Sequence, residues 1–323
     1  AVVFLVVSFF TAGLMSLVPG KPEVIVIPFD QTGEQQQAFR EANNLDEPLP
    51  VRWFEWAKDF LSGDMGNFYS ATGGEAVATR FGESWPVSLS LIFYTQVVAL
   101  AIAIPFAIWA AYRSGGWVDK VINTTAFALI SLPSFAIALI LTYYLGVKMG
   151  WLPTQGYVRL TEDPAEHFRS VAIPVMSLAA GQVAVYMRLL RSDLVATLQE
   201  DFILMARSKG ISNGRVLWRH ALRPSSLTLL TVTGLSMGNL IGGTLVVEYL
   251  LSIPGLGVLL GEAVLSRQYE ALQSLVAIIA IVNLVSTMMR HQSLTQGDLR
   301  VQTGAVSSAR IVERELRQTT YLV

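Results

Sequence analysis

Six long apolar runs, separated by polar stretches, organise this chain. A run of about 20 apolar residues is long enough to cross the ~30 Å hydrocarbon core of a bilayer as a helix. The pattern therefore predicts an all-α, polytopic membrane protein with six transmembrane helices. The expected spans are residues 1–18, 87–112, 121–147, 168–190, 225–251 and 275–289.

Prolines occur within three of these expected spans. Pro105, Pro133 and Pro174 each remove one helical hydrogen bond, but neighbouring helices can satisfy the freed carbonyl group inside a membrane protein. We therefore expect Pro105 to kink the second span, and we expect the third and fourth spans to contain Pro133 and Pro174 without ending there.

The polar stretches divide the chain into regions. Residues 1–18 have no preceding basic segment and no small-residue cleavage site, so we interpret them as a first, N-terminally incomplete transmembrane helix rather than a signal peptide. An extracytoplasmic loop or subdomain follows at 19–86. The five-helix transmembrane core, 87–291, contains a basic loop at 193–224, and the chain ends in a polar tail, 292–323.

Within the extracytoplasmic region, five large side chains are expected on one helical face: Trp53, Phe54, Trp56, Phe60 and Leu61. Such a face is typical of a helix that lies in the membrane interface, where aromatic side chains are favoured. It is equally typical of a small extramembrane subdomain with its own apolar contact. Both interpretations stay open.

The distribution of charge predicts the orientation. The chain has 23 Lys and Arg against 24 Asp and Glu, 52% hydrophobic residues and a mean hydropathy of +0.49. Because no basic excess exists to neutralise phosphates, we expect no nucleic-acid partner. Lys and Arg concentrate at 188–223, whereas 21–84 and 148–167 are acidic or nearly neutral. The positive-inside rule then predicts that 188–223 and both termini are cytoplasmic.

Ionisable residues are almost absent from the expected spans, which disfavours coupling to an ion gradient. No phosphate-binding loop of the G-x-x-x-x-G-K-[ST] type occurs, so the chain is not expected to hydrolyse nucleotide. His167, His220 and His291 are far apart in sequence, and the chain has no cysteine, so neither a metal site nor a catalytic triad is expected. Energy for active transport would have to come from partners. A gradient-driven secondary transporter and a passive channel or scaffold remain the alternatives.

The basic stretch from Glu200 to Pro224 predicts a helix, a glycine break and a second helix. Residues 200–209 have the apolar spacing of a short amphipathic helix that ends at Gly210, and Ser212 is a candidate N-cap for the next helix. Taken alone, this stretch is compatible with a partner-binding element and with an ordinary basic loop.

The segments MARSKG and RHALRP resemble the cytoplasmic loop of ABC-importer permeases, in which an alanine, three residues and a glycine form the helix that docks into the ATPase subunit. Ala206 and Gly210 have this spacing. Further matching segments, in order, are LVPGKP, DFLSGDMGNFY, SLPSF, GWLPTQGY and VVEYLLSIPGLGVLLGEAVLSRQYEALQSLV. Together they resemble the dipeptide/oligopeptide (and nickel) transport permease family, of the first-permease type with a large external loop after the first helix.

This resemblance implies a type I ABC-importer permease fold and a non-catalytic subunit of the bacterial plasma (inner) membrane that forms half of a pathway for di- or oligopeptides. It implies as partners a second homologous permease, two cytoplasmic ATPase subunits, an extracytoplasmic peptide-binding protein, the peptide substrate and membrane lipid. ATP and Mg²⁺ would be bound by the ATPase subunits, with no cofactor in this chain.

The resemblance also implies a set of ATPase-docking residues, in which apolar side chains are buried against the partner and basic ones form a polar rim. These are Glu200, Asp201, Phe202, Ile203, Met205, Ala206, Arg207, Lys209, Gly210 and Arg215. The glutamate that opens the family motif is replaced here by Ile203-Leu204-Met205. A bulky residue in place of Gly210 is expected to abolish coupled uptake and to leave membrane insertion intact.

Residues that line the transport pathway are expected among small and polar side chains within the spans. The candidates are Ser131, Ser134, Ser236, Asn239, Gly243 and Thr244. Close packing of helices explains the same residues equally well.

Overall fold

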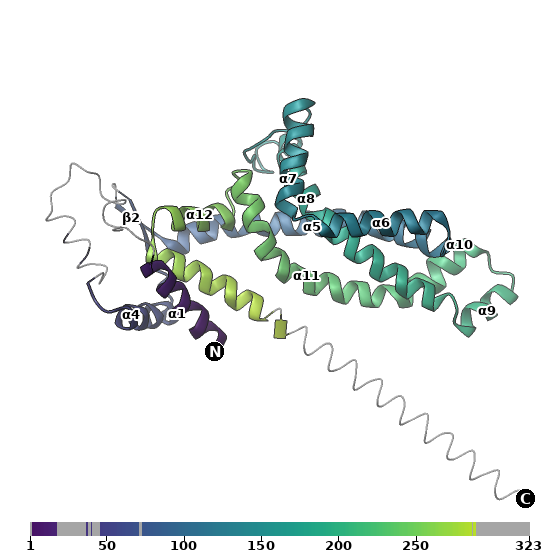
Figure 1. Ribbon diagram of the computed structural model, residues 1–323, viewed down its shortest axis with the longest axis horizontal. Helices are drawn as coiled ribbons and strands as arrows, with labels where there is room; N and C mark the ends of the chain where they lie inside the picture. The colour runs from purple at the N-terminus through teal and green to yellow at the C-terminus, as the bar shows by residue number, and fades with distance from the viewer. Residues whose placement is uncertain are drawn as a thin grey trace, which may run out of the picture.

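The computed structural model describes residues 2–17, 37, 40, 46–70, 73–285 and 287–288. Its elements are α1 Val2–Leu17, α4 Leu49–Ser62, β1 Asn67–Ser70, β2 Gly73–Ala76, α5 Val77–Tyr112, α6 Trp117–Ser131, α7 Ser134–Leu141, the π-helix η1 Thr142–Lys148, α8 Pro164–Thr197, α9 Asp201–Ser208, α10 Asn213–Arg215, the π-helix η2 Val216–Ala221, α11 Leu222–Leu250 and α12 Leu256–Leu265. A further apolar helix covers Tyr269–Val285. The molecule is elongated, and α5, α8 and α11 pack side by side along its long axis (Figure 1). The predicted tail, 292–323, lies outside the described residues.

In the described part of the chain, three helices are long and apolar enough to cross a membrane. These are α5, α8 and the continuous helix Asn213–Leu250, which α10, η2 and α11 form together. They correspond to the second, fourth and fifth expected spans, and each begins earlier than predicted. The first and sixth expected spans correspond to the shorter apolar helices Phe4–Leu14 and Tyr269–Val285.

The third expected span, 121–147, does not continue through its proline, which corrects the expectation. Its two halves, α6 and the α7–η1 helix, meet at an angle of 100°. Leu132 (φ −96°, ψ 128°) and Pro133 (φ −61°, ψ 143°) both have extended backbone. Because the proline ring disfavours the α region for the residue before it, α6 ends there, and α7 projects sideways from the bundle (Figure 1). Pro105 and Pro174, in contrast, lie inside α5 and α8.

The contact between α5 and α8 is built on small residues. Ala99, Ala103 and Ala107 follow one another at helical spacing on α5, and all three are fully buried. Small side chains allow two helix backbones to approach closely, and the resulting packing stabilises helix pairs in lipid. This stripe explains why α5 and α8 form the central pair of the bundle.

A buried polar cluster joins the same three long helices. Tyr186 of α8 donates a hydrogen bond to Oε1 of Gln96 on α5 (2.8 Å), and Gln96 Nε2 donates to Oγ of Ser236 on α11 (2.9 Å). The hydroxyl groups of Tyr186 and Ser236 also contact each other. Since a polar group without a partner is costly in an apolar interior, this cluster fixes how the three helices are rotated against one another.

At the opposite end from α9, α4 packs on α1 and on the helix Tyr269–Val285 (Figure 1). Trp53 Nε1 donates a hydrogen bond to Ser8 Oγ, and Trp56 Nε1 donates to Ser274 Oγ, each at 3.0 Å. One face of α4 is therefore covered by α1 and by the helix Tyr269–Val285.

The five large side chains expected on one face of this helix lie on two faces. Trp53, Trp56 and Phe60 contact aromatic residues of α1 or each other. Phe54 and Leu61 are 66% and 77% exposed. Residues seven apart share a face of a helix, so Phe54 and Leu61 form a separate exposed stripe.

A β-hairpin completes this subdomain. Strands β1 and β2 pair in antiparallel fashion, with Phe68 opposite Glu75. Tyr69 donates its backbone N–H to Gln268 Oε1 (2.9 Å), and Gln268 Nε2 donates back to the Tyr69 carbonyl (2.7 Å). Helix α5 begins directly after β2, so the last ten residues of the predicted 19–86 loop are the first turns of α5.

Candidate functional site

The helix–glycine–helix element predicted from the sequence connects α8 to α11 at one end of the molecule (Figure 1). Helix α9 begins at Asp201, directly after Glu200, whose backbone is extended. The acidic Asp201 lies in its first turn and the basic Arg207 in its last, which complements the helix dipole at both ends. The element is therefore a defined helix and turn rather than an irregular loop.

Gly210 ends α9 in a left-handed conformation, with φ at +76°. The N–H of Gly210 donates to the carbonyl of Arg207 (2.9 Å), and the N–H of Ile211 donates to the carbonyl of Ala206 (3.3 Å). These two bonds form the Schellman pattern of helix C-termini. This pattern requires a left-handed residue four positions after Ala206, the acceptor that comes earlier in the chain. The Ala206-x-x-x-Gly210 spacing therefore has a structural cause.

Two of the expected docking residues face the bundle rather than a partner. Ile203 is fully buried and Ala206 is 7% exposed, and both pack with Val216, Leu217 and Ala221 in one core cluster. The expectation that Ile203 supplies a docking contact is corrected, because every surface of its side chain is already covered. Ile203 and Ala206 instead hold α9 firmly against η2.

The outward side of α9 carries apolar side chains. Phe202, Leu204 and Met205 are 46%, 53% and 59% exposed, and Trp218 of η2 is 59% exposed. Leu204 was not among the expected docking residues, although its place between Ile203 and Met205 in an amphipathic helix gave the signal. Exposed apolar groups gathered on one short helix are typical of a surface that a partner covers.

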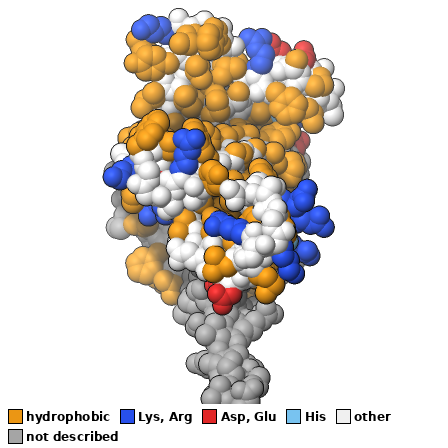
Figure 2. All heavy atoms as spheres, turned by 90° about the vertical axis from the view of Figure 1, so that its right-hand side faces the viewer, with side chains coloured by type: hydrophobic (Ala, Val, Ile, Leu, Met, Phe, Trp, Pro, Cys, Tyr) orange, Lys and Arg blue, Asp and Glu red, His pale blue; other side chains and the backbone are white. Residues whose placement is uncertain are grey.

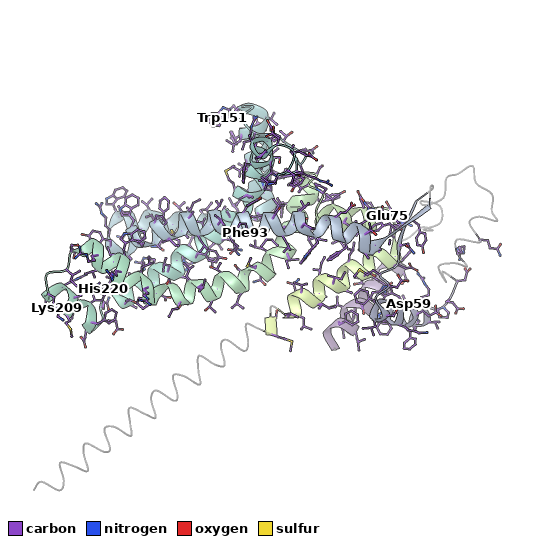
Figure 3. The ribbon with its side chains drawn as sticks, turned by 180° about the vertical axis from the view of Figure 1, so that it is seen from behind. Asp59, Glu75, Phe93, Trp151, Lys209 and His220 are labelled. Carbon is purple, nitrogen blue, oxygen red and sulfur yellow. The ribbon has the colours of Figure 1, made fainter. Side chains whose placement is uncertain are left out.

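Basic residues surround this apolar face. The end-on view in Figure 2 shows Lys and Arg side chains at several positions around hydrophobic ones. Arg207, Lys209 and Arg215 are all exposed, as are Glu200 and Asp201 at the start of the helix. Lys209 lies at the extreme tip of the molecule (Figure 3). An apolar centre with a polar, charged rim is the usual anatomy of a protein–protein interface.

The six candidate pathway residues do not gather on one surface. Ser236 and Thr244 are buried, and Ser236 belongs to the polar cluster with Gln96 and Tyr186. Asn239, also on α11, is exposed. Of the others, Ser131 is exposed, and Ser134 and Gly243 are partly buried.

Sequence reasoning overlooked Glu248, which lies near the end of α11 and holds the first residues of α12 in place. Glu248 is fully buried, and its Oε2 accepts a hydrogen bond from the backbone N–H of Gly257 (2.7 Å). Ser88 Oγ likewise accepts from the N–H of Leu256 (2.9 Å). A Cβ atom on Gly257 would lie 2.1 Å from the carbonyl oxygen of Leu245, so the close approach requires glycine. A lone glutamate followed by the IPGLG segment was the available signal.

The family model described as binding-protein-dependent transport system inner membrane component matches residues 103–291. A Sinorhizobium fredii protein named "Probable peptide ABC transporter permease" is 30% identical over 300 residues, which cover 93% of this chain and 95% of that protein. The nickel import system permease NikB of Staphylococcus aureus is 32% identical over 314 residues, which cover 94% and 92%.

A solved structure shares the fold. The MetNI methionine ABC transporter, in inward-facing conformations, aligns with a TM-score of 0.51 at 13% identity, covering 67% of this chain and 95% of that chain. Within the described residues, no group of three or more His, Cys, Asp or Glu side chains could hold a metal ion. The chain therefore belongs to the family of binding-protein-dependent transport system inner membrane components, and it is a non-catalytic permease subunit of an ABC importer whose ATPase activity lies in partner subunits.

Proposed function

We propose that this permease imports di- or oligopeptides. The peptide permease named above supports this substrate class, since it matches this chain along nearly its whole length. In the proposed assembly, a second homologous permease pairs with this chain to enclose the pathway, and a peptide-binding protein delivers substrate from outside. Two cytoplasmic ATPase subunits bind ATP and Mg²⁺ and supply the energy.

The observation that carries the proposal is the surface of α9. Its exposed Phe202, Leu204 and Met205 would enter an apolar groove on one ATPase subunit, and Arg207, Lys209 and Arg215 would meet acidic or polar groups at the groove's rim. This end of the molecule would then be cytoplasmic, in agreement with the positive-inside rule, and both termini would lie on the same side.

The buried side of α9 supplies the coupling. When the ATPase subunits close on ATP, a displacement of α9 would pass to η2 and α11 through Ile203 and Ala206, because both pack in one core with Val216 and Leu217. Packed cores shift between discrete arrangements rather than deforming gradually. A short helix held in this way acts as a rigid lever.

Reconstitution tests the proposal. The two permeases and two ATPase subunits are placed in proteoliposomes with the binding protein, and uptake of labelled di-, tri- and longer peptides and of nickel is measured with and without ATP. We expect peptide uptake that requires ATP and persists when an ionophore removes all ion gradients. Uptake that needs a gradient and ignores ATP would instead establish a secondary transporter, and ATP-dependent uptake of nickel alone would exclude peptides as the substrate.

A further inference from the structure

A cavity of about 500 Å³ lies in the half of the molecule opposite to α9 and extends along α5 from Arg80 to Tyr94. It lies between the first turns of α5, the loop 157–160 and the segment 254–262 that contains the start of α12. Figure 3 shows Lys209 and Glu75 towards opposite ends of the long axis. This half of the molecule lies away from the proposed ATPase-docking surface of α9.

Four charged side chains line the cavity, and they differ in how they are paired. Arg80 forms a salt bridge with Glu262, and its Nε lies 3.7 Å from Glu75 Oε2. The positive charge of Arg80 is therefore already neutralised. Arg159 and Glu83 also line the cavity and are exposed, and within the described residues neither takes part in a salt bridge. The cavity thus offers one positive and one negative group, from two different elements, without protein partners.

The interior of the cavity combines hydrogen-bonding groups with apolar surface. His167 Nδ1 lies 2.7 Å from the Val158 carbonyl oxygen and donates to it, and Nε2 lies 3.2 Å from the Tyr94 hydroxyl oxygen. Tyr94 also lines the cavity, and its hydroxyl group can both donate and accept hydrogen bonds. Val87 and Val258 supply apolar surface.

The wall beside α12 is held in place by buried polar contacts. Ser88 accepts from the Leu256 N–H and Glu248 from the Gly257 N–H, which fixes the segment that carries Val258 into the cavity. A site that binds a small molecule needs such preformed walls, because ordering a mobile loop on binding would cost affinity.

Resting on the proposed function, we infer that this cavity is an entry site for a short zwitterionic peptide of two or three residues. Arg159 binds the peptide's terminal carboxylate, Glu83 binds its ammonium group, Tyr94 accepts a hydrogen bond, and apolar side chains of the peptide contact Val87 and Val258. Cavities of roughly 300–1,000 Å³ suit ligands of this size. Among the described residues, no group of three or more His, Cys, Asp or Glu side chains that could hold a metal ion lines the cavity.

Cysteine labelling tests the inference, because the natural chain contains no cysteine. In the complete transporter, Val258→Cys inside the cavity is labelled with a membrane-impermeant maleimide at increasing concentrations of trialanine. Leu160→Cys, at another part of the rim, is a second reporter, and Ser62→Cys at the end of α4 is the control outside the cavity. We expect trialanine to slow labelling at positions 258 and 160 and to leave position 62 unchanged.

Charge variants identify the two contacts. Arg159→Gln should raise the half-protecting concentration of trialanine about tenfold and that of trialanine amide less than twofold, since the amide has no carboxylate to lose. Glu83→Gln should likewise raise the half-protecting concentration of trialanine about tenfold and that of N-acetyl-trialanine less than twofold, since the acetylated peptide has no ammonium group. These pairings separate a specific contact from a general loss of the site.

Three outcomes would overturn the inference: no protection by trialanine, protection that both charge variants leave unchanged, or protection that needs only the binding protein and no peptide. ATP-driven uptake of trialanine is measured in the same vesicles. Uptake without protection rejects the cavity and retains the import function, whereas protection without ATP-driven uptake rejects the import function and retains the cavity.

Discussion

At the scale of single residues, Gly210 explains the Ala206-x-x-x-Gly210 spacing. Its left-handed backbone completes the cap of α9, and no atom lies within 4 Å of the position that a Cβ would occupy. Conformation rather than space therefore requires glycine. This refines the expectation from the sequence, in which bulk at this position was the concern.

Replacing Gly210 with alanine should strain the cap by about 1–2 kcal/mol, the usual cost of a left-handed conformation for a residue with a Cβ. We expect ATP-driven uptake to fall about tenfold, because the same strain displaces α9. ATP-driven uptake should fall less in Gly210→Asn, since asparagine tolerates the left-handed conformation.

The matched control is Gly214→Ala, in the next turn of the same connection. Gly214 has ordinary backbone angles and equally open space around its Cβ position. Uptake in Gly214→Ala should equal that of the wild type. Equal losses in the two alanine variants would contradict the role assigned to Gly210.

Tyr69 gives a prediction that depends on pH. Burial, together with the nearby Glu270 carboxylate, raises the pKa of Tyr69 to about 12 from its ordinary 10.0. Between these values the unfolded chain releases a proton that the folded hairpin keeps, so the contribution of Tyr69 to folding stability is lost as the pH rises from 10 towards 12.

Ultraviolet absorbance of tyrosinate measures this directly. The difference between alkaline titrations of the wild type and Tyr69→Phe should show one tyrosine with a midpoint near pH 12, while circular dichroism reports that the helices persist. A midpoint near 10 in the folded protein would show that Tyr69 is not buried as described.

At the scale of elements, a bidentate ion pair joins the start of α6 to α8. Arg191 donates from Nε to Asp119 Oδ1 (2.7 Å) and from Nη2 to Oδ2 (2.5 Å). Asp119 also accepts from the Gly115 N–H and from Asn123 Nδ2. With only 7% of the Asp119 side chain exposed, this contact holds the turn after α5 against the bundle.

Asp119→Ala should lower the free energy of unfolding by about 3 kcal/mol, because it leaves the Arg191 charge without its buried partner. The control is Glu166→Ala, which breaks the exposed pair Glu166–Arg169 on the same α8 and should cost less than about 1 kcal/mol. Denaturant unfolding in one detergent compares them. Equal losses would show that the Asp119 contact does not hold α6.

The pattern of apolar residues predicted the elements well, but not how each one ends or turns. Runs of sufficient length identified α5, α8 and α11, since hydropathy depends on composition alone. Pro133 ends its helix whereas Pro105 and Pro174 do not, and the difference lies in the extended Leu132. Which proline breaks a helix depends on the packing around it, and the sequence does not show that packing.

The same limit applies to side chains. An amphipathic pattern identified α9 and its glycine, but it did not separate the buried Ile203 from the exposed Leu204 beside it. Polar residues in apolar runs suggested a pathway, yet Ser236 bonds to Gln96 and Tyr186 across helices. Contacts between residues far apart in the chain decide such roles.

At the scale of the whole molecule, the two ends have different characters. One end presents α9 with its exposed apolar and basic side chains, and the other carries the hairpin and α4 (Figures 1 and 3). The cavity lies in this second half, and among the described residues its Arg159 and Glu83 take part in no salt bridge. The long helices α5, α8 and α11 connect the two ends, joined by the Gln96–Tyr186–Ser236 cluster. A permease that couples an ATPase on one side to a solute on the other requires this separation.

The central claim is that α9 docks into an ATPase subunit, and site-specific cross-linking tests it most directly. Met205 is exposed on α9 and Ile203 is buried beside it, so Met205→Cys and Ile203→Cys form a matched pair in a chain without cysteine. In the purified complete transporter, with a maleimide–photoreactive linker, position 205 should cross-link to an ATPase subunit in an ATP-dependent manner, and position 203 should not. Absence of any ATPase cross-link from position 205, while Ser62→Cys at the opposite end gives one, would contradict the account.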